Sequence, residues 1–414
     1  MRYLGCILVI LTFCSAPSVL ASSRSITNAD SHSAPLSATS YSIRSLADSL
    51  TANISDETAK ARAIFSWIAH NVSYDVSCFG LNESADQVLL KRRAVCAGYA
   101  NLFEALADSA DIQSKTIRGE AKGIGPPAAM TPDGLLKHDW NAVYLDGKWH
   151  LLDCAWGAGR IDEYGRFVPR YDEHYFLTPP EQLIYDHLPE DPRWQLVPAP
   201  ISRNEFIHRP IVKPAFFEYD LKLKSHTLHP IDTDGELLLT IEAPNDINIT
   251  ATIHHADTQL DTRHTFTQPT EDGYEIHVTF PHPGDYILRV HARRRGAASP
   301  FYDCAVEYNI HTIDANTQLF PKTYLSFQEW GCRLDRPLAG TFNLNTPMEF
   351  ELHAPGAREV LIANTNNEVL TRFKPTADSI FAGSVAPDTG TIRLFGKFPG
   401  YTKYLALLEY SAAK

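Results

Sequence analysis

Three side chains that could together carry out acyl chemistry lie between Arg92 and Gly159. They are Cys96, His138 and Asp153. Acyl transfer by a thiol needs a sulfur that attacks, an imidazole that takes its proton and a carboxylate that orients the imidazole. Each residue type taken alone is most often structural, so the elements that carry the three residues have to support the interpretation.

The residues after Cys96 predict an amphipathic helix that begins close to this cysteine. Its apolar positions at helical spacing are Tyr99, Leu102, Phe103, Leu106 and Ala110. The N-terminus of a helix has unpaired N–H groups and the positive end of the helix dipole, which favour a thiolate over a thiol. The backbone N–H of Cys96 would also be well placed to bind an oxyanion.

The segment from His138 to Leu152 predicts a hairpin closed by the two-residue turn Asp146-Gly147. This turn fixes a register in which Trp140 lies opposite Asp153. His138 and Asp153 then become diagonal neighbours on one face, with roughly 6–8 Å between their backbones. Trp140 shares this face, so we expect it to form part of a cleft wall, although most tryptophan area in the hairpin should be core.

Four stretches resemble the transglutaminase-like superfamily, and within it the kyphoscoliosis peptidase group. These stretches are Val95–Ala100 (VCAGYA), His138–Val143 (HDWNAV), Leu152–Gly159 (LDCAWGAG) and Tyr175–Val197. The resemblance covers residues 42 to about 206 well and the β-rich remainder more loosely. It implies a papain-like core with Cys96 as nucleophile, His138 as base and Asp153 as the residue that orients the base.

One position departs from the papain-like pattern. Papain-like enzymes often place a glutamine several residues before the cysteine, where its side chain completes the oxyanion hole. Leu90 and Gln87 are the residues found in this part of the chain. The second donor of the oxyanion hole therefore stays unassigned at this stage.

We expect an α+β protein in which a papain/transglutaminase-like catalytic domain (42–205) is followed by two all-β immunoglobulin-like sandwiches (206–313 and 314–414). After about Phe206 the chain shows short alternating strands separated by turn residues. Ala243-Pro244 after one apolar strand recurs as Ala354-Pro355 roughly 110 residues later, which favours two tandem copies.

The N-terminus predicts export. Residues 1–21 combine Arg2, a short apolar run and Val19-Leu20-Ala21, which is typical of a secretory signal peptide. Residues 22–41 are rich in serine, alanine and small polar residues and predict a disordered leader. Because no segment is long and apolar enough to span a bilayer, we expect a secreted or periplasmic protein without a membrane span.

The composition and the motifs limit which partners and cofactors we expect. The net charge of −12 in 414 residues, without a dense Lys/Arg stripe, argues against nucleic acid as the main partner. The chain contains no CxxC or HExxH motif, so we expect neither a metal nor another cofactor. Nothing in the sequence indicates the oligomeric state.

The cysteine count predicts disulfides. Beyond the signal peptide lie five cysteines, namely Cys78, Cys96, Cys154, Cys304 and Cys332. An odd number in an exported protein leaves at least one free thiol, and Cys96 is the natural candidate. The other four could form two disulfides in three ways, of which we favour a Cys304–Cys332 pair for its proximity in the sequence. The hairpin register directs Cys154 away from the face of Asp153.

The resulting expectation is an exported thiol acyl-transfer enzyme that acts on proteins or peptides through a thioester at Cys96. Peptidase activity is the leading form, because the resemblance is to a peptidase group and water is always available as the acceptor. Transglutaminase and deamidase activities share the thioester and stay open. The alternatives are a non-catalytic protein-binding or scaffolding module that retains this fold, and a surface-associated structural protein.

Overall fold

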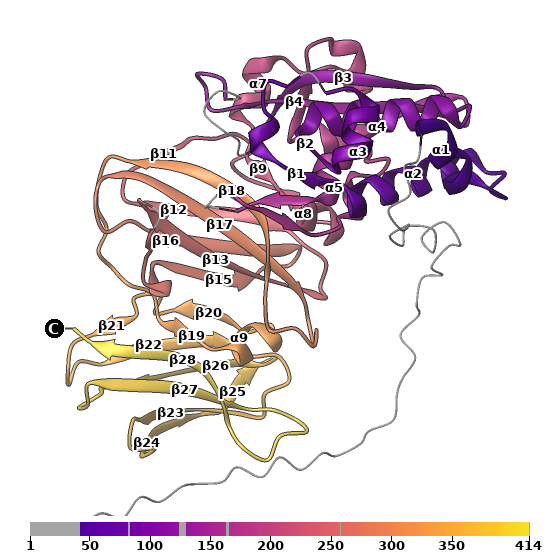
Figure 1. Ribbon diagram of the computed structural model, residues 1–414. Coiled ribbons are helices and arrows are strands. Elements are labelled where there is room, and N and C mark those ends of the chain that lie inside the picture. Colours follow the sequence, from indigo (N-terminus) through magenta and orange to yellow (C-terminus); the bar gives the residue numbers. More distant parts are fainter. Residues whose placement is uncertain (1–41, 82, 124–129, 163–164, 257, 414) are drawn as a thin grey trace, which may run out of the picture. The chain divides into compact units, whose positions relative to one another are not determined.

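The computed structural model describes residues 42–413 with the exception of 82, 124–129, 163–164 and 257 (Figure 1). The predicted signal peptide (1–21) and leader (22–41) lie outside the described residues. Among the described residues, no helix is both long enough and apolar enough to cross a bilayer.

The chain divides into two compact units. One comprises residues up to Thr116 together with Trp140–Phe176, and the other comprises Ile117–Asp139 together with Leu177–Lys414. Strands β3 (Ser114–Ala121) and β4 (Leu136–Leu145) each contain one of these boundaries. The predicted domain limits at 205/206 and 313/314 stay predictions.

Helices dominate the first unit. They are α1 (Ile43–Thr51), α2 (Glu57–Asn71), α3 (Ala85–Lys91), α4 (Cys96–Ser109) and α5 (Cys154–Ala158). The N-cap of α2 is Asp56, whose carboxylate accepts from the Ala59 N–H at 2.6 Å.

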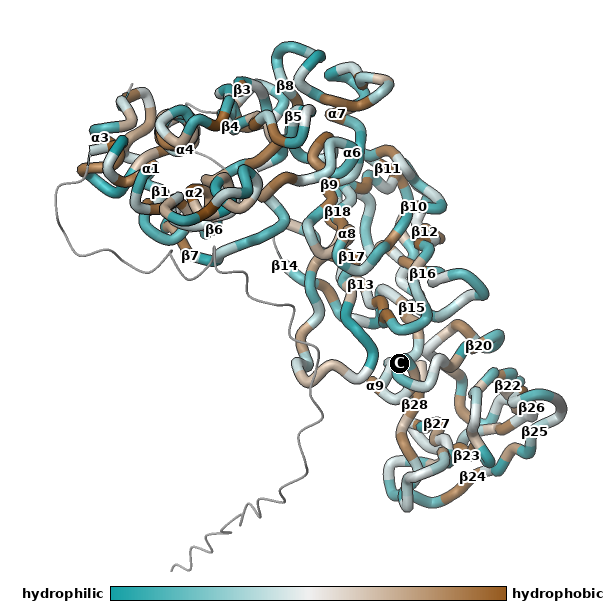
Figure 2. Tube along the Cα trace, turned by 90° about the vertical axis from the view of Figure 1, so that its right-hand side faces the viewer, coloured by the Kyte–Doolittle hydropathy of each residue, from teal (hydrophilic) through white to brown (hydrophobic). Residues whose placement is uncertain are grey.

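Helix α4 begins at Cys96, as predicted. Its buried side chains include Leu102, Phe103 and Leu106, and it packs against α1 and α3. Brown and teal segments follow one another along α4 in Figure 2, as expected for a helix with one buried face. Burial of this face fixes the helix end that carries Cys96.

The predicted hairpin is present. Strands β4 and β5 (Lys148–Leu152) pair in the predicted register, with Tyr144 opposite Trp149 and Leu145 opposite Lys148. Both turn residues have left-handed backbones, with φ 50° at Asp146 and 80° at Gly147, which is the turn type that matches the strand twist. The hairpin is the edge of a four-stranded sheet in the order β5-β4-β3-β8, with β8 at His187–Pro189.

The register prediction fails at its last two pairs. Strand pairing ends at Leu152, so the expected partners Trp140–Asp153 and His138–Ala155 do not form ladder pairs. Asp153 instead caps α5, because its carboxylate accepts from the N–H groups of Ala155 and Trp156. This side-chain cap competes with the strand ladder and ends it one residue earlier than alternation suggests.

Short elements link the core to the β-rich region. They are β6 (Gly159–Ile161), which pairs with β7 (Phe167–Pro169), and the helices α6 (Pro180–Leu183) and α7 (Arg203–His208). The helical part contains one more short pair, in which β1 (Ser73–Tyr74) runs parallel to β2 (Arg93–Ala94).

The first sandwich encloses one apolar core between two sheets. One sheet has the order β10 (Lys222–Leu223), β12 (Glu236–Glu242), β16 (Gly273–Thr279), β15 (Thr265–Pro269). The other has the order β11 (Ile231–Thr233), β18 (Asp303–Thr312), β17 (Gly284–Arg294), β13 (Ile247–His255), β14 (Thr258–Gln259), with β9 (Ile211–Val212) added to β18.

The second sandwich has its own core. Its first sheet has the order β19 (Lys322–Thr323), β28 (Leu405–Ala412), β27 (Thr391–Lys397), β23 (Glu359–Asn364), β24 (Val369–Phe373), with β21 (Thr341–Phe342) added to β28. Its second sheet has the order β20 (Arg333–Arg336), β22 (Met348–His353), β26 (Ile380–Val385), β25 (Pro375–Ala377).

The internal repeat is visible in matching elements. Ala243 follows β12 and Ala354 follows β22, and each of these strands pairs with its counterpart in the same way, β12 with β16 and β22 with β26. A short helix precedes each set, α8 (Pro214–Glu218) in the first and α9 (Leu325–Glu329) in the second. The fold is thus a mixed α/β domain followed by two β-sandwiches, as predicted.

The disulfide prediction is wrong. All five described cysteines are free thiols. Cys304 lies on β18, opposite His291, whereas Cys332 is fully buried in the core of the second sandwich. Sequence proximity is a poor guide here, because the two residues belong to separate sandwiches with separate apolar cores.

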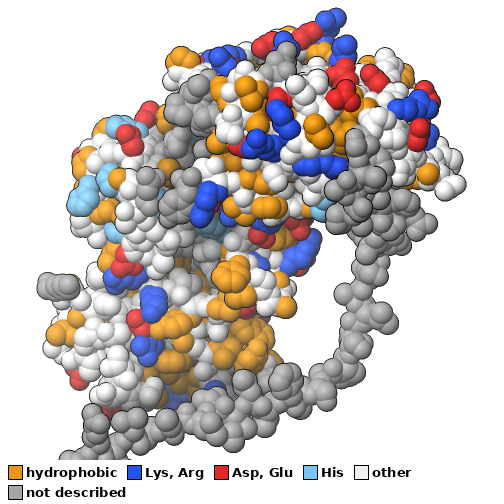
Figure 3. Space-filling view, in the orientation of Figure 1, with side chains coloured by type: hydrophobic (Ala, Val, Ile, Leu, Met, Phe, Trp, Pro, Cys, Tyr) orange, Lys and Arg blue, Asp and Glu red, His pale blue; other side chains and the backbone are white. Residues whose placement is uncertain are grey.

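Charges of both signs are mixed on the face shown in Figure 3, without an extended stretch of one sign. Several cations are paired with more than one acid. Arg203 contacts Glu120 and Asp133, and Lys224 contacts Glu242 and Asp272. Such exposed pairs contribute little to stability.

Candidate active site

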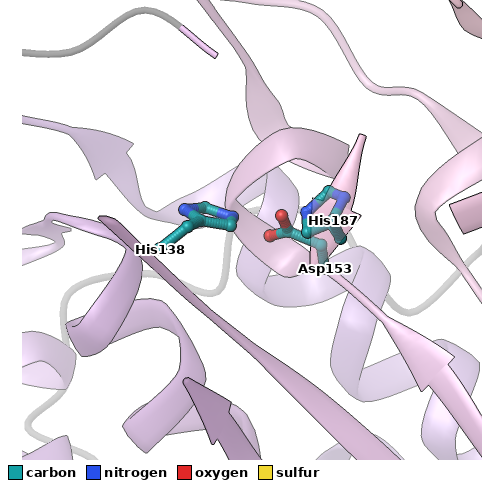
Figure 4. Close-up of side chains that lie close together, drawn as sticks. All are labelled: His138, Asp153 and His187. Carbon is teal, nitrogen blue, oxygen red and sulfur yellow. The ribbon is translucent and has the colours of Figure 1, made fainter. Parts of the chain in front are cut away.

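Two of the predicted site residues, His138 and Asp153, lie close together and are buried, and a third group, His187, joins them. One nitrogen of each imidazole and one carboxylate oxygen all lie within 4.8 Å of one another. The three side chains are only 2 %, 1 % and 1 % exposed, respectively. Figure 4 shows the Asp153 carboxylate between the two rings, with the ring of His138 directed toward it.

His138 is the third residue of β4, on the buried side of the strand. Its proximity to Asp153 was predicted from the hairpin register, but the structure achieves it differently. The carboxylate comes from the helix cap that follows β5 rather than from a paired strand position. The prediction of proximity was therefore right, while the local geometry behind it was only partly right.

The Asp153 carboxylate is held by its own helix. Its Oδ1 accepts from the N–H of Ala155 at 2.8 Å and from the N–H of Trp156 at 3.1 Å, and the Asp153 N–H donates to the Tyr175 carbonyl at 2.9 Å. Hydrogen bonds to a carboxylate stabilise its ionised form. This arrangement suits a group that orients an imidazole and stabilises its charged form.

His187 was missed in the sequence analysis. Its Nδ1 lies 2.6 Å from Oδ1 of Asp186, and its ring centroid lies 5.2 Å from that of His138. Strand β8 places it opposite Ala121 of β3. The adjacent Asp186-His187 inside the family-like segment Tyr175–Val197 was the signal that could have identified it.

His138, Asp153 and His187 are also the residues that could hold a metal. Two imidazoles and one carboxylate form a common ligand set for divalent transition metals, and Asp186 behind His187 resembles the support that ligating histidines often have. The same atoms equally suit a chain of hydrogen bonds from Asp186 to His138. The expectation of a metal-free site stays a prediction.

Cys96 is the first residue of α4 and is 7 % exposed. Tyr74 pairs with Ala94, two residues before Cys96, and both the side chain and the backbone of Cys96 influence the pKa of Tyr74. Burial, and after it the neighbouring Cys96 and Asp153, raise the pKa of Tyr74 well above its ordinary value. The assembly of Cys96 with His138 and Asp153 into a triad stays a prediction.

Three other cysteines are less suited than Cys96 to act as the nucleophile. Burial, and after it the charge of Asp153, raises the pKa of Cys154 well above its ordinary value. Burial likewise raises the pKa of Cys304 to about 11 and that of Cys332. These three side chains therefore stay protonated at neutral pH, when thiols are weak nucleophiles.

The two remaining hairpin residues of interest are core residues. Trp140 is 1 % exposed, so its role as a cleft wall stays a prediction. Asn141 is fully buried, and its side-chain amide donates to the Ala100 carbonyl of α4 at 3.1 Å. Asn141 thus ties β4 to the helix that carries Cys96.

Two family descriptions match separate parts of the chain. Residues 44–154 match the transglutaminase-like superfamily, and residues 203–321 match the KY-like, immunoglobulin-like domain. The first range includes Cys96, His138 and Asp153. The chain therefore contains a transglutaminase-like core and a KY-like immunoglobulin-like domain.

Curated relatives extend this finding. Human kyphoscoliosis peptidase is 30% identical over 268 residues, which cover 63% of this chain and 39% of the human protein. The Lim and transglutaminase domain protein ltd-1 of Caenorhabditis elegans is 30% identical over 221 residues (49% of this chain, 30% of that protein). Hillarin of Drosophila melanogaster is 30% identical over 224 residues (50% and 27%). The chain is thus a distant homologue of these proteins. It spans 39% of the length of the human relative and a smaller share of the other two.

Proposed function

We propose that this chain is an exported thiol acyl-transfer enzyme that acts on proteins or peptides through a thioester at Cys96. The observation that carries the proposal is the buried His138–Asp153 pair in a transglutaminase-like core whose α4 begins with Cys96. A thiol at a helix start, an imidazole and a fixed carboxylate are the groups that this chemistry needs.

In the proposed reaction, His138 takes the proton of the Cys96 thiol and the sulfur attacks the carbonyl carbon of an amide. The resulting oxyanion binds the N–H of Cys96. As the tetrahedral intermediate collapses, the C–N bond breaks and the leaving amine takes the proton from His138, so a thioester remains. Asp153 stays ionised throughout and holds the imidazole in position.

The second half of the reaction decides the activity class. His138 takes a proton from water, the hydroxide attacks the thioester, and Cys96 leaves and recovers its proton from His138. The products are a carboxylic acid and the free enzyme. We propose hydrolysis as the leading form, supported by the similarity to a human protein named as a peptidase. An amine in place of water would give transamidation instead.

Export is the second part of the proposal. It rests on the composition of residues 1–21, which combine a basic residue, an apolar run and small residues at the expected cleavage position. Expression of the full chain with a C-terminal tag, followed by N-terminal sequencing of the secreted or periplasmic product, tests it. We expect a mature chain that begins close to Ser22, whereas a product that keeps Met1 and stays in the cytosol would contradict export.

The activity is tested with a complex peptide mixture and two proteins, the wild type and Cys96→Ala. The wild type should create new peptide termini, Gln-to-Glu conversions or isopeptide links, and mass spectrometry distinguishes these three outcomes. None of them should arise with Cys96→Ala. Products that are equal for both proteins would contradict the proposal, and selective peptide capture without conversion by either protein would favour the non-catalytic alternative.

A further inference from the structure

The position of Tyr74 is set by the backbone beside the proposed nucleophile. Strand β1 pairs in parallel with β2, so that Tyr74 lies opposite Ala94, two residues before Cys96. The Ser73 N–H donates to the Arg92 carbonyl at 2.9 Å and the Asp75 N–H donates to the Ala94 carbonyl at 3.0 Å. The residue between these two bonds is Tyr74, which therefore has little freedom to move along the strand.

Helix α4 also contacts the segment that contains Tyr74. The Tyr99 hydroxyl donates to the Val72 carbonyl at 2.5 Å, and the rings of Tyr74 and Tyr99 stack with centroids 6.2 Å apart. Tyr99 lies in the first turn of α4, one turn from Cys96. The Tyr74 ring is thus fixed relative to the helix end that presents the thiol.

The hydroxyl of Tyr74 lies close to Cys96. Tyr74 pairs with Ala94 and its ring stacks on Tyr99, and both the side chain and the backbone N–H of Cys96 influence the pKa of Tyr74. This N–H is the group that would bind an oxyanion in the proposed reaction. Burial and neighbouring negative charge keep the Tyr74 hydroxyl protonated at neutral pH, so its proton is available for donation.

The position used for this purpose in papain-like enzymes offers no donor here. Leu90 is apolar and 79 % exposed. Gln87 is exposed and is engaged in a capping box, where its Oε1 accepts from the Ser84 N–H at 2.9 Å. A second oxyanion donor therefore has to come from another element.

We propose that the Tyr74 hydroxyl is the second donor of the oxyanion hole at Cys96, which deepens and rests on the proposed acyl-transfer function. A substrate carbonyl oxygen binds the Cys96 N–H, and the Tyr74 hydroxyl donates to the same oxygen as the oxyanion develops. Tyr74 donates one hydrogen bond in this step, and its proton is not transferred.

The test compares acylation, which forms an oxyanion, with alkylation, which does not. p-Nitrophenyl acetate reports acylation of the thiol by release of p-nitrophenolate, and iodoacetamide reports alkylation of the same sulfur. In Tyr74→Phe the ring and its stacking stay in place while the donor is lost. We expect a fall in the acylation rate on the order of 10²–10³-fold and a change of less than about tenfold in the alkylation rate of Cys96.

Two further variants make the result decisive. Tyr144→Phe is the matched control, because Tyr144 is 38 % exposed and its hydroxyl donates to Gly147 in the hairpin turn; both rates should equal those of the wild type. Cys96→Ala gives the background from other groups. Loss of acylation in Cys96→Ala but not in Tyr74→Phe overturns the Tyr74 assignment alone, whereas acylation that persists in Cys96→Ala overturns the proposed function as well.

Two more outcomes would contradict the assignment. Faster acylation in Tyr74→Phe would mean that the hydroxyl blocks the site instead of serving it. An equal loss of acylation and alkylation would mean that Tyr74 only positions the thiol. The melting temperature of Tyr74→Phe, compared with that of Tyr144→Phe, shows whether either result comes from misfolding.

Discussion

Asp153 combines two roles in one side chain. One carboxylate oxygen caps α5 through the Ala155 and Trp156 N–H groups, while the group as a whole lies against His138. Capping and orientation differ in what they require. An amide oxygen can also accept from backbone N–H groups, but it carries no charge to stabilise an imidazolium.

Asp153→Asn should therefore separate the two roles. We expect the free energy of unfolding to change by less than about 1 kcal/mol, because the amide oxygen keeps the cap. The acylation rate should fall by roughly 10²–10⁴-fold, because the imidazole loses the charge that orients it. Thermal unfolding and p-nitrophenyl acetate kinetics check the two expectations.

The matched variant is Asp153→Ala, which removes the cap as well and should cost about 1 kcal/mol more in stability than Asp153→Asn. Acylation at the wild-type rate in Asp153→Asn would contradict the role assigned to this carboxylate.

At the scale of residues, the sequence indicated part of the site and not the rest. The proximity of His138 and Asp153 followed from a two-residue turn, because such a turn fixes the register of both strands. Tyr74 gave no signal, since a two-residue parallel pair has no periodicity to detect. His187 was hidden for a similar reason, because its strand β8 has only three residues.

At the scale of elements, α4 depends on a close approach that only glycine permits. A Cβ at Gly98 would lie 2.5 Å from the Ala94 Cβ and 3.0 Å from the Val88 Cγ2. These atoms belong to β2 and α3, which pack against the first turn of α4. The position of Cys96 therefore depends on an empty space at Gly98.

Gly98→Ala should destabilise the protein by about 1–3 kcal/mol through overpacking, although alanine has the higher intrinsic helix propensity. Asp108→Ala in the same helix is the control, because Asp108 is exposed and the change gains propensity without a clash. Urea unfolding of both variants measures the difference. A Gly98→Ala protein that is as stable as Asp108→Ala would contradict the close approach.

Lys122, directly after β3, has a side-chain amine that is largely buried. Burial, and to a smaller extent the charge of Arg209, lowers its pKa to about 7, against an opposing effect of Asp186. Its Nζ donates to the Arg209 carbonyl and lies 4.8 Å from the centre of the Phe206 ring. Between about pH 7 and its ordinary pKa near 10.5, the unfolded chain binds this proton and the folded chain does not.

Stability should therefore rise with pH across this window, since the unfolded state holds the extra proton. The effect of one group is at most about 1.4 kcal/mol per pH unit. We expect the stability of the wild type relative to Lys122→Met to increase between pH 7 and pH 10 and to be constant below pH 6.5. Urea unfolding at several pH values measures this difference, and a flat difference over the whole range would refute the lowered pKa.

At the scale of the whole molecule, the element order could be predicted because alternating strands and turn residues repeat along the sequence. The alternating pattern after Phe206 predicted strands that include residues 236–244, 247–255 and 304–311, and these correspond to β12, β13 and β18. The contacts between the two sandwiches could not be predicted, since they depend on single side chains. Phe266 belongs to β15 of the first sandwich, yet it is part of the apolar core of the second.

Phe266→Ala should therefore weaken the sandwich that does not contain it. A buried phenylalanine replaced by alanine typically costs 3–5 kcal/mol, about what we expect here. Hydrogen exchange followed by mass spectrometry should show faster exchange in β22 and β27 of the second sandwich. Phe280→Ala, in the core of the first sandwich, should accelerate exchange in β12 and β17 instead. Unchanged exchange in β22 and β27 of Phe266→Ala would contradict the shared packing.

The central claim is that Cys96 forms a thioester, and direct detection of this bond is its sharpest test. After brief exposure to p-nitrophenyl acetate at neutral pH, mass spectrometry of the intact and digested protein should find one acetyl group. We predict that this group lies on Cys96, that hydroxylamine releases it and that Cys96→Ala does not acquire it. An acetyl group on any other residue, or one that forms equally in Cys96→Ala, would contradict the account.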